Sequence, residues 1–404
     1  MKRLFFLILV FPITLTYSNV WALNGTQLIA FSAMHEGIAG GGTALPLDYS
    51  SMVNNPAGLT ELPQSASFNQ FLAFPVNQSN TSATPIGNPS LGNQFSNDDN
   101  VYLPGGGFIV KTPWLRSRVT LGMSILATSG FAVDYESPRL NPALLSGDQN
   151  YDTHTLYGVF KILPTIAFEV NDQFSIGVTL HINRTQLETD FSTGAAGGFV
   201  QTAGRSRLDF SWGVGAGIGV LYKPSEKLSF GVNYVSEQYI EDYERYKDIL
   251  PIGMNLPQQL NTGMALSLKK NLIVTGDFKW INWEGSKGGT GASLGEGGFG
   301  WQDQYIGILG IQWGVAENLI LSAGFNHGRS SIPEESLFTN ILAPTISENH
   351  LAFGVGYFVN TWMRLDASYS HTFKNTVTDN ATTTGGAFAS LAVDQVQVEA
   401  TINF

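Results

Sequence analysis

Apolar and polar residues alternate with a period of two along most of the chain, from about residue 65 to the C-terminus. In residues 174–182 (FSIGVTLHI), Phe174 and every second residue after it are apolar, whereas the residues between them are small or polar. Residues 228–234 and 363–373 repeat this pattern. An apolar and a polar face over roughly 10 residues are typical of a transmembrane β-strand, which turns one face to lipid and the other to a polar lumen. A β-sandwich gives the same alternation, usually over shorter strands.

The alternation predicts about fourteen strands, an even number, as in single-chain bacterial barrels. They are expected at residues 66–77, 101–111, 117–131, 152–169, 173–188, 205–222, 226–238, 258–269, 271–283, 302–314, 317–328, 348–359, 361–373 and 391–404. The connections alternate between short ones, such as Lys270 and Asn360, and long ones, such as 78–100 and 374–390. Short periplasmic turns and long outer loops produce this rhythm, and a sandwich has no reason to show it. We therefore expect an all-β membrane protein, an antiparallel transmembrane β-barrel.

The ends of the predicted strands carry two further signals. Trp280, Trp283, Trp301, Trp313 and Trp362 lie near strand ends, as an aromatic belt at the membrane interfaces would place them. The last strand ends in Phe404, and its apolar face suits closure of a barrel, which leaves no unpaired strand edge in lipid.

The N-terminal residues do not follow the strand pattern. Lys2 and Arg3 precede an apolar run at 4–15, and Val20 and Ala22 form a small-residue cleavage site, so residues 1–22 are predicted to be a signal peptide. Residues 23–63 contain scattered apolar residues around three consecutive glycines at 40–42. Because about fourteen strands enclose a bore too wide for their own side chains to fill, we expect 23–63 to form a hatch that plugs a barrel of residues 64–404.

Composition and motifs exclude several other classes of protein. The net charge is −11, and removal of Lys2 and Arg3 makes the mature chain −13, so a basic surface for nucleic acid is not expected. The chain has no Cys, and its six His are scattered without the spacing of metal ligands. It has neither a phosphate-binding loop motif nor a G-x-S-x-G motif. We therefore expect no cofactor, no metal and no catalytic residues.

Several short motifs, in this order along the chain, resemble the FadL family of outer-membrane transporters for long-chain fatty acids and related hydrophobic molecules. They are 36–42 (EGIAGGG), Asp48, 55–57 (NPA), 127–135 (ATSGFAVDY), 212–213 (WG), 219–222 (GVLY), 256–257 (LP) and the terminal Phe404. The resemblance implies a 14-stranded barrel in the outer membrane of a Gram-negative bacterium, closed by an N-terminal hatch, with a ligand that leaves sideways through the wall. It also implies that the protein is a monomer surrounded by lipid and lipopolysaccharide, which the barrel-assembly machinery inserts through the last strand. Residues 191–206 are short and rich in Gly and Ala, where the family has a long helical loop.

Two groups of residues are candidates for gating. In the hatch they are Asp48 and the turn Asn55, Pro56 and Ala57, which we expect to hold the closed conformation. In the wall they are the strand breakers Pro104, Gly105, Gly106 and Gly107 of one strand and Ser129, Gly130 and Phe131 of the next. Missing ladder bonds on both sides of one seam would open it, and pairing back from the turn at 112–116 places Pro104 opposite roughly residue 124. A plain bulge beside the hatch backbone is the alternative.

A carboxylate ligand would need a cation or hydrogen-bond donors inside an apolar pocket. Arg184, near the outer end of its strand, is the candidate that the resemblance suggests. Lys279 and Arg364 lie on polar faces, and we expect them to pair with Asp209, Asp277 or Asp366 and to fill the barrel.

The predicted function is passive, ligand-gated uptake of hydrophobic small molecules through an outer-membrane channel. The alternatives are a general diffusion porin, an outer-membrane lipase or protease, and a non-catalytic adhesin. A porin does not need an N-terminal plug, and a hydrolase would need His beside Ser or Asp, for which His154 and His327 are the only positions. Long-chain fatty acids and hydrocarbons both suit an apolar pocket, so the substrate stays open.

Overall fold

The structure is a computed structural model of the whole chain. It describes residues 23–84, 92–97, 100–112, 118–135, 153–189, 191–193, 199–201, 207–247, 253–289, 298–381 and 385–404. The predicted signal peptide, residues 1–22, lies outside the described residues.

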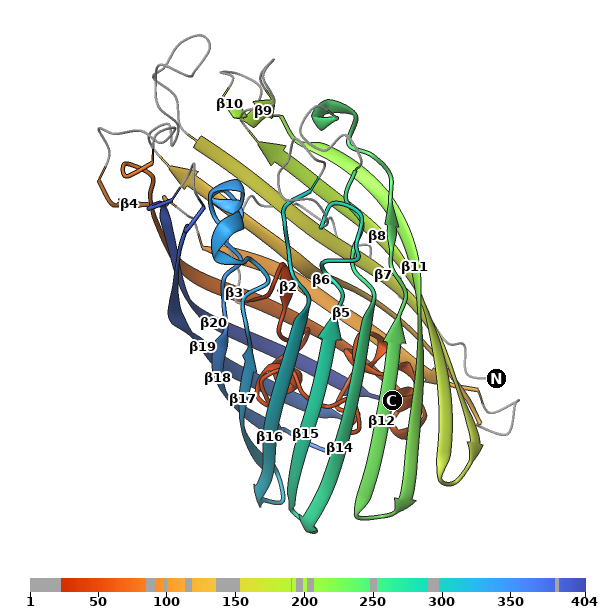
Figure 1. Cartoon of the computed structure of the whole chain (residues 1–404). Helices are drawn as coiled ribbons and strands as arrows, with labels where there is room; N and C mark the ends of the chain where they lie inside the picture. The colour runs from red at the N-terminus through yellow and green to blue at the C-terminus, as the bar shows by residue number, and fades with distance from the viewer. Residues whose placement is uncertain are drawn as a thin grey trace.

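Fourteen long strands of the described chain form a closed antiparallel barrel, as the alternation predicted (Figure 1). They are β3 (Ser65–Asn80), β5 (Val101–Lys111), β6 (Val119–Tyr135), β7 (Thr153–Asn171), β8 (Phe174–Thr189), β11 (Asp209–Ser225), β12 (Leu228–Val235), β14 (Gln259–Lys269), β15 (Leu272–Ile281), β16 (Gln304–Ala316), β17 (Leu319–Gly328), β18 (Asn349–Phe358), β19 (Met363–Thr378) and β20 (Phe388–Asn403). All fourteen match predicted strands, with ends shifted by a few residues. The barrel closes where β20 pairs with β3, from Asn403 opposite Ser65 to Phe388 opposite Asn80.

The two faces of the wall have opposite chemistry, which is the reason for the alternation in sequence. On β16, for example, Tyr305 and Leu309 face outward and are exposed, whereas Gln304 and Ile306 face inward and are buried. Short turns join the strands at one end, which follows the expectation for the periplasmic side, and long connections join them at the other. None of the helices in the described part of the chain is long and apolar enough to cross a membrane.

We call the described parts of the long outer connections the outer cap. Their short elements are β4 (Gln94–Phe95), β9 (Phe191–Thr193), β10 (Phe199–Gln201), β13 (Tyr239–Ile240), η4 (Glu244–Tyr246), η6 (Glu334–Ser336) and η7 (Phe338–Asn340). Trp283 and Trp301 pack edge to face in this cap, with ring centroids 5.3 Å apart, and both are buried. Their assignment to an interfacial belt was therefore wrong, because loop packing covers them. Trp313 and Trp362 are exposed on the outer face.

Residues ahead of β3 lie inside the barrel and form the segment that we call the hatch (Figure 1). Its elements are β1 (Leu23–Asn24), β2 (Gln27–Leu28), α1 (Ala33–Glu36), α2 (Ser51–Asn54) and η1 (Pro56–Glu61). None of these elements exceeds six residues, so tertiary contacts must stabilise them.

Glycines of the wall make room for the hatch backbone. A Cβ built on Gly231 would lie 2.0 Å from the Thr43 carbonyl oxygen, and one on Gly324 would lie 2.3 Å from the carbonyl carbon of Ile38. A Cβ on Gly177 would similarly lie 2.4 Å from the Pro56 carbonyl carbon. At these positions any larger residue would push the hatch away from the wall.

Candidate functional site

The ladder between β5 and β6 stops partway along the wall. It runs from Lys111 opposite Thr120 to Gly106 opposite Ile125, whereas the pairing of β5 with β3 continues to Val101. The expected partner of Pro104 was wrong by about three residues, since Gly107 lies opposite Ser124. The cause is at the turn, where the Thr112 N–H donates to the Val119 carbonyl and moves the turn centre forward.

Beyond Ile125, β6 no longer behaves as a wall strand with one lipid face. Its residues alternate between exposed and buried up to Ile125, and residues 126–133 are all buried. A bulge interrupts its pairing with β7 between Ala127 and Ser129. The backbone of β6 next meets β4 and its flank, where the Asn97 N–H donates to the Asp134 carbonyl at 2.7 Å. We call the stretch between Gly106–Ile125 and Asn97–Asp134 the seam.

The hatch occupies the inner side of the seam. Gln27 of β2 pairs with Ser129, and the Gly130 N–H donates to the Thr26 carbonyl at 2.8 Å. Phe131 is buried and packs against Tyr157, with ring centroids 5.3 Å apart and the ring planes tilted by 33°. The structure therefore brings the predicted wall residues of both strands to one place, together with the first residues of the hatch.

A pocket lies at this place, between the hatch and the wall. Its lining is almost entirely apolar and comes from the hatch, β3, β5, β6 and β20: Leu28, Ala30, Phe31, Asn69, Phe71, Leu103, Pro104, Gly105, Leu126, Ala127 and Gln397. It has room for about one water molecule. A hydrophobic ligand larger than water needs more space than the pocket has here.

Asn55, Pro56 and Ala57 connect the hatch to the wall. The Asn55 side-chain amide donates to the carbonyls of Thr43, at 2.7 Å, and Val220, at 2.9 Å. Its Oδ1 accepts from the Ala57 N–H and caps η1, in which Pro56 is the first residue. The three residues lie against Gly177 and Gly219, where a Cβ would overlap them.

Asp48 orders the hatch from within. Its carboxylate accepts from the Ser32 hydroxyl and from the Ser50 N–H, both at 2.6 Å, and burial raises its pKa. It touches neither the pocket nor Asn55 in the contacts described. Asp48 is thus a hatch residue, placed to keep the loops before α1 and α2 together.

Carboxyl groups that sequence reasoning missed also dock the hatch. Glu36 accepts hydrogen bonds at 2.6 Å from the hydroxyls of Ser368 and Ser370 on β19. Burial raises the pKa of Glu36, and these hydrogen bonds oppose the shift. On β15, Asp277 accepts from the N–H groups of Gly42 and Thr43. The sequence offered Glu36 only as the first residue of the motif 36–42 and Asp277 only as a partner for a lumen cation, so neither contact with the hatch or the wall was predicted.

Arg184 does not reach the lumen. It lies on the face of β8 that carries the exposed Val178 and Leu180, and its guanidinium carbon lies 4.4 Å from the Phe210 ring centroid and 4.9 Å from that of Trp212. The strand period places it outward, and the resemblance had suggested an inward position.

The buried cation of the lumen in this region is Lys161 on β7. Its ammonium donates to Gln238 Oε1 at 2.8 Å and forms no ion pair among the described residues. His181 is buried nearby on β8, and its Nδ1 has no hydrogen-bond partner there. Arg364, in contrast, pairs with Asp366 at 2.7 Å, as expected for a residue that fills the barrel.

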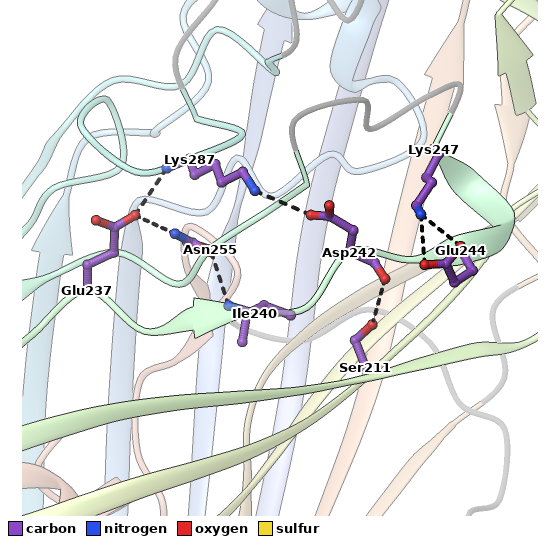
Figure 2. A network of polar contacts seen from close by, with 8 residues as sticks. All are labelled: Ser211, Glu237, Ile240, Asp242, Glu244, Lys247, Asn255 and Lys287. Atoms are coloured by element: carbon purple, nitrogen blue, oxygen red, sulfur yellow. Dashed lines mark hydrogen bonds and ion pairs between the residues drawn. The ribbon is translucent and has the colours of Figure 1, made fainter.

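The outer cap is tied together by a polar network (Figure 2). Glu237 accepts from the Asn255 side chain and the Lys287 N–H, and the Lys287 ammonium pairs with Asp242 at 3.3 Å. These contacts join the connections that follow β12 and β15. Under this cap, Gly25 at the tip of the β1–β2 hairpin packs against the indole of Trp283.

Comparison with known proteins places the chain. Residues 14–403 match the model of a family described as outer membrane protein transport protein (OMPP1/FadL/TodX). The chain belongs to this family. It is therefore an outer-membrane protein of a family of transport proteins, not of enzymes, and the hydrolase alternative is set aside.

Solved structures of the family share the fold at low sequence identity. A FadL homologue of Pseudomonas aeruginosa is 16% identical, with a TM-score of 0.67 over 94% of this chain and 100% of that chain. The toluene transporter TodX of P. putida is 14% identical, with a TM-score of 0.70 over 93% of this chain and 99% of that chain. The toluene transporter TbuX of Ralstonia pickettii is 14% identical, with a TM-score of 0.68 over 93% of this chain and 98% of that chain. No curated protein sequence matches the chain.

Proposed function

We propose that this protein is a passive channel for hydrophobic small molecules, gated by the hatch, with an exit through the seam between β5 and β6. The observation that carries the proposal is the coincidence of three features at one height. The β5–β6 ladder ends at Gly106, the hatch hairpin takes its place on β6, and an apolar pocket lies between them. A ladder that stops within the wall is costly, because an unpaired backbone group in hydrocarbon costs several kcal/mol.

Transport by relatives supports the same reading. Two structural neighbours are toluene transporters and another is a monoaromatic hydrocarbon channel. A general diffusion porin fits less well, because buried apolar residues of the hatch and of the outer cap pack with the wall in one hydrophobic cluster.

A disulfide across the seam tests the exit directly. A Cβ on Gly105 would lie 3.5 Å from the Leu126 Cβ, within the range for a disulfide, and the chain has no other Cys. The oxidised Gly105→Cys/Leu126→Cys variant should lose uptake of labelled hydrophobic ligand in a transporter-deficient host, and reduction should restore it. The single variants control for the side chains, and Ala265→Cys/Thr275→Cys, across the intact β14–β15 ladder, controls for cross-linking itself. Full uptake by the oxidised seam variant would rule out lateral exit.

Lys161 favours a ligand with an anionic end. A buried ammonium without a carboxylate partner in the described residues gains most from a ligand that supplies one. We infer that long-chain fatty acids are substrates in addition to hydrocarbons, with Lys161 in the role first assigned to Arg184. Lys161→Met should lower uptake of oleate and leave toluene uptake unchanged, whereas Arg184→Met should affect neither. Equal loss for both ligands would assign Lys161 to folding.

A further inference from the structure

Two polar side chains interrupt the apolar lining of the seam pocket. Asn69 lies on β3 and Gln397 on β20, the two strands that close the barrel, and both are buried. The Asn69 Nδ2 donates to Gln397 Oε1 at 2.8 Å. All other side chains that line the pocket are apolar.

The side-chain oxygen of Asn69 is a hydrogen-bond acceptor without a donor in the described residues. Asn69 is only 3% exposed, and its Oδ1 has no hydrogen-bond partner among the described residues. A buried acceptor without a partner costs roughly 1–3 kcal/mol. Of the other pocket side chains only Gln397 carries a donor, and its Nε2 likewise has no hydrogen-bond partner among the described residues. Gln397 faces Asn69 through its oxygen, so a ligand with a hydroxyl group can supply the donor that Asn69 Oδ1 lacks.

The hydrogen bond to Gln397 sets which way the Asn69 amide points. Gln397 Oε1 accepts from Asn69 Nδ2, so the nitrogen of Asn69 lies on that side and its oxygen is the atom without a partner.

We propose that Asn69 is a specificity-determining residue, and that the seam pocket selects hydrophobic ligands that carry a hydrogen-bond donor. Such ligands are alcohols, phenols and the un-ionised form of fatty acids. They bind in preference to hydrocarbons and ethers of the same size, which would leave Oδ1 unpaired. This inference rests on the proposed exit through the seam, and adds the chemical class that the exit prefers.

Uptake of two isomers distinguishes the effect of a hydrogen-bond donor from the effects of ligand polarity and size. 1-Dodecanol and methyl undecyl ether have the same atoms, and only the alcohol has an O–H. Their initial uptake rates are measured in a transporter-deficient Gram-negative host that expresses the full-length protein, with the rate of the empty-vector host subtracted. Wild type should take up the alcohol about tenfold faster than the ether, the ratio for one hydrogen bond.

Replacement of the acceptor should remove the preference. Asn69→Leu has nearly the same shape without the amide, and its alcohol-to-ether ratio should fall to about one through faster ether uptake and slower alcohol uptake. Asn77→Leu is the matched control, because Asn77 is another buried asparagine of β3 that does not line the pocket, and it should keep the wild-type ratio. Asn69→Val serves as a second variant if Asn69→Leu does not assemble.

The outcomes distinguish the two proposals. Equal rates for both isomers in wild type, or faster uptake of the ether, would overturn the role of Asn69 while leaving the channel in place. A wild-type preference that survives in Asn69→Leu would do the same. Uptake of neither isomer above the empty-vector rate would contradict the proposed function itself.

Discussion

Asn55 of the hatch donates its side-chain amide to the backbone carbonyl of Val220 in β11, at 2.9 Å. The same side chain holds the Thr43 carbonyl and caps η1, so one residue joins two hatch loops to the barrel wall. The position is made by neighbouring glycines of β8 and β11, where a Cβ would occupy the space of the hatch. Docking of the hatch thus depends on hydrogen bonds that no strand of the barrel needs for its own ladder.

Asn55→Ala should therefore loosen the hatch and spare the barrel. Loss of the cap and of two hydrogen bonds should cost about 1–3 kcal/mol of hatch docking. Amide exchange in α2 and η1 should become faster, while heat-modifiable migration on gels, which reports a folded barrel, should not change. Asn80→Ala at the outer end of β3 is the control, and should change neither. Loss of the folded barrel in Asn55→Ala would make the residue structural and remove its gating role.

A methyl group on an inward-facing glycine should displace the hatch by steric overlap alone. At Gly231 a Cβ would lie 2.0 Å from the Thr43 oxygen, so Gly231→Ala should force the hatch loop off β12. We expect a severalfold increase in permeability to a small hydrophilic antibiotic, because the bore opens. Gly307 on β16 faces outward with no atom within 4 Å of its built Cβ, and Gly307→Ala should behave as wild type. Equal permeability of the two variants would show that the barrel wall shifts to accommodate the methyl group and that the hatch stays in place.

The strands of the barrel wall could be predicted from the sequence, whereas most contacts inside the barrel could not. The number of strands could be counted because one face of each strand meets lipid, which requires an apolar residue at every second position. The lengths of the connections between these strands then gave their alternation. Residues 23–63 were expected to form a hatch because they lack the same pattern. Asp277, Asn69 and Lys161 were not predicted as site residues, because an inward polar residue of a strand has the same sequence pattern whether it meets water, the hatch or a ligand. Arg184 was wrong for a different reason: the resemblance suggested an inward position, whereas the alternation along β8 places Arg184 on the same outer face as Val178 and Leu180.

Acid should weaken docking of the hatch through His35. Burial, and secondarily the charge of Lys279, lower the pKa of this histidine from 6.5 to about 3 in the docked hatch. A released hatch would bind a proton near pH 6.5 that the docked hatch cannot, so docking is strongest above about 6.5 and weakens as the pH falls toward 3. Between pH 7.5 and 5, the protection of α1 amides in wild type should fall on the order of tenfold relative to His35→Gln. Burial raises the pKa of Glu36, so ionisation of Glu36 weakens docking as the pH rises. This effect is opposite to that of His35, and it is the same in wild type and in His35→Gln. Parallel profiles would assign the pH dependence to groups other than His35.

Gly25 tests whether the outer cap and the seam are coupled. It adopts a φ of +63° at the tip of the β1–β2 hairpin, and a Cβ there would lie 2.6 Å from the Trp283 indole. Gly25→Ala should therefore strain the hairpin and separate it from the cap, and the hairpin is the element that pairs with Ser129 at the seam. We expect faster exchange of the Gly130 amide, which donates to Thr26, and faster uptake of hydrophobic ligand, with no change at Asn55.

Trp283→Ala separates strain from contact in the same experiment. It removes the indole without altering the hairpin backbone, so it should release the hairpin to a smaller extent and partly restore Gly25→Ala when the two are combined. Restoration in the double variant would identify the Gly25–Trp283 contact as the connection between cap and seam. Additive effects of the two changes would mean that cap and hairpin move independently, and that a ligand at the outer loops must reach the seam before the hatch responds.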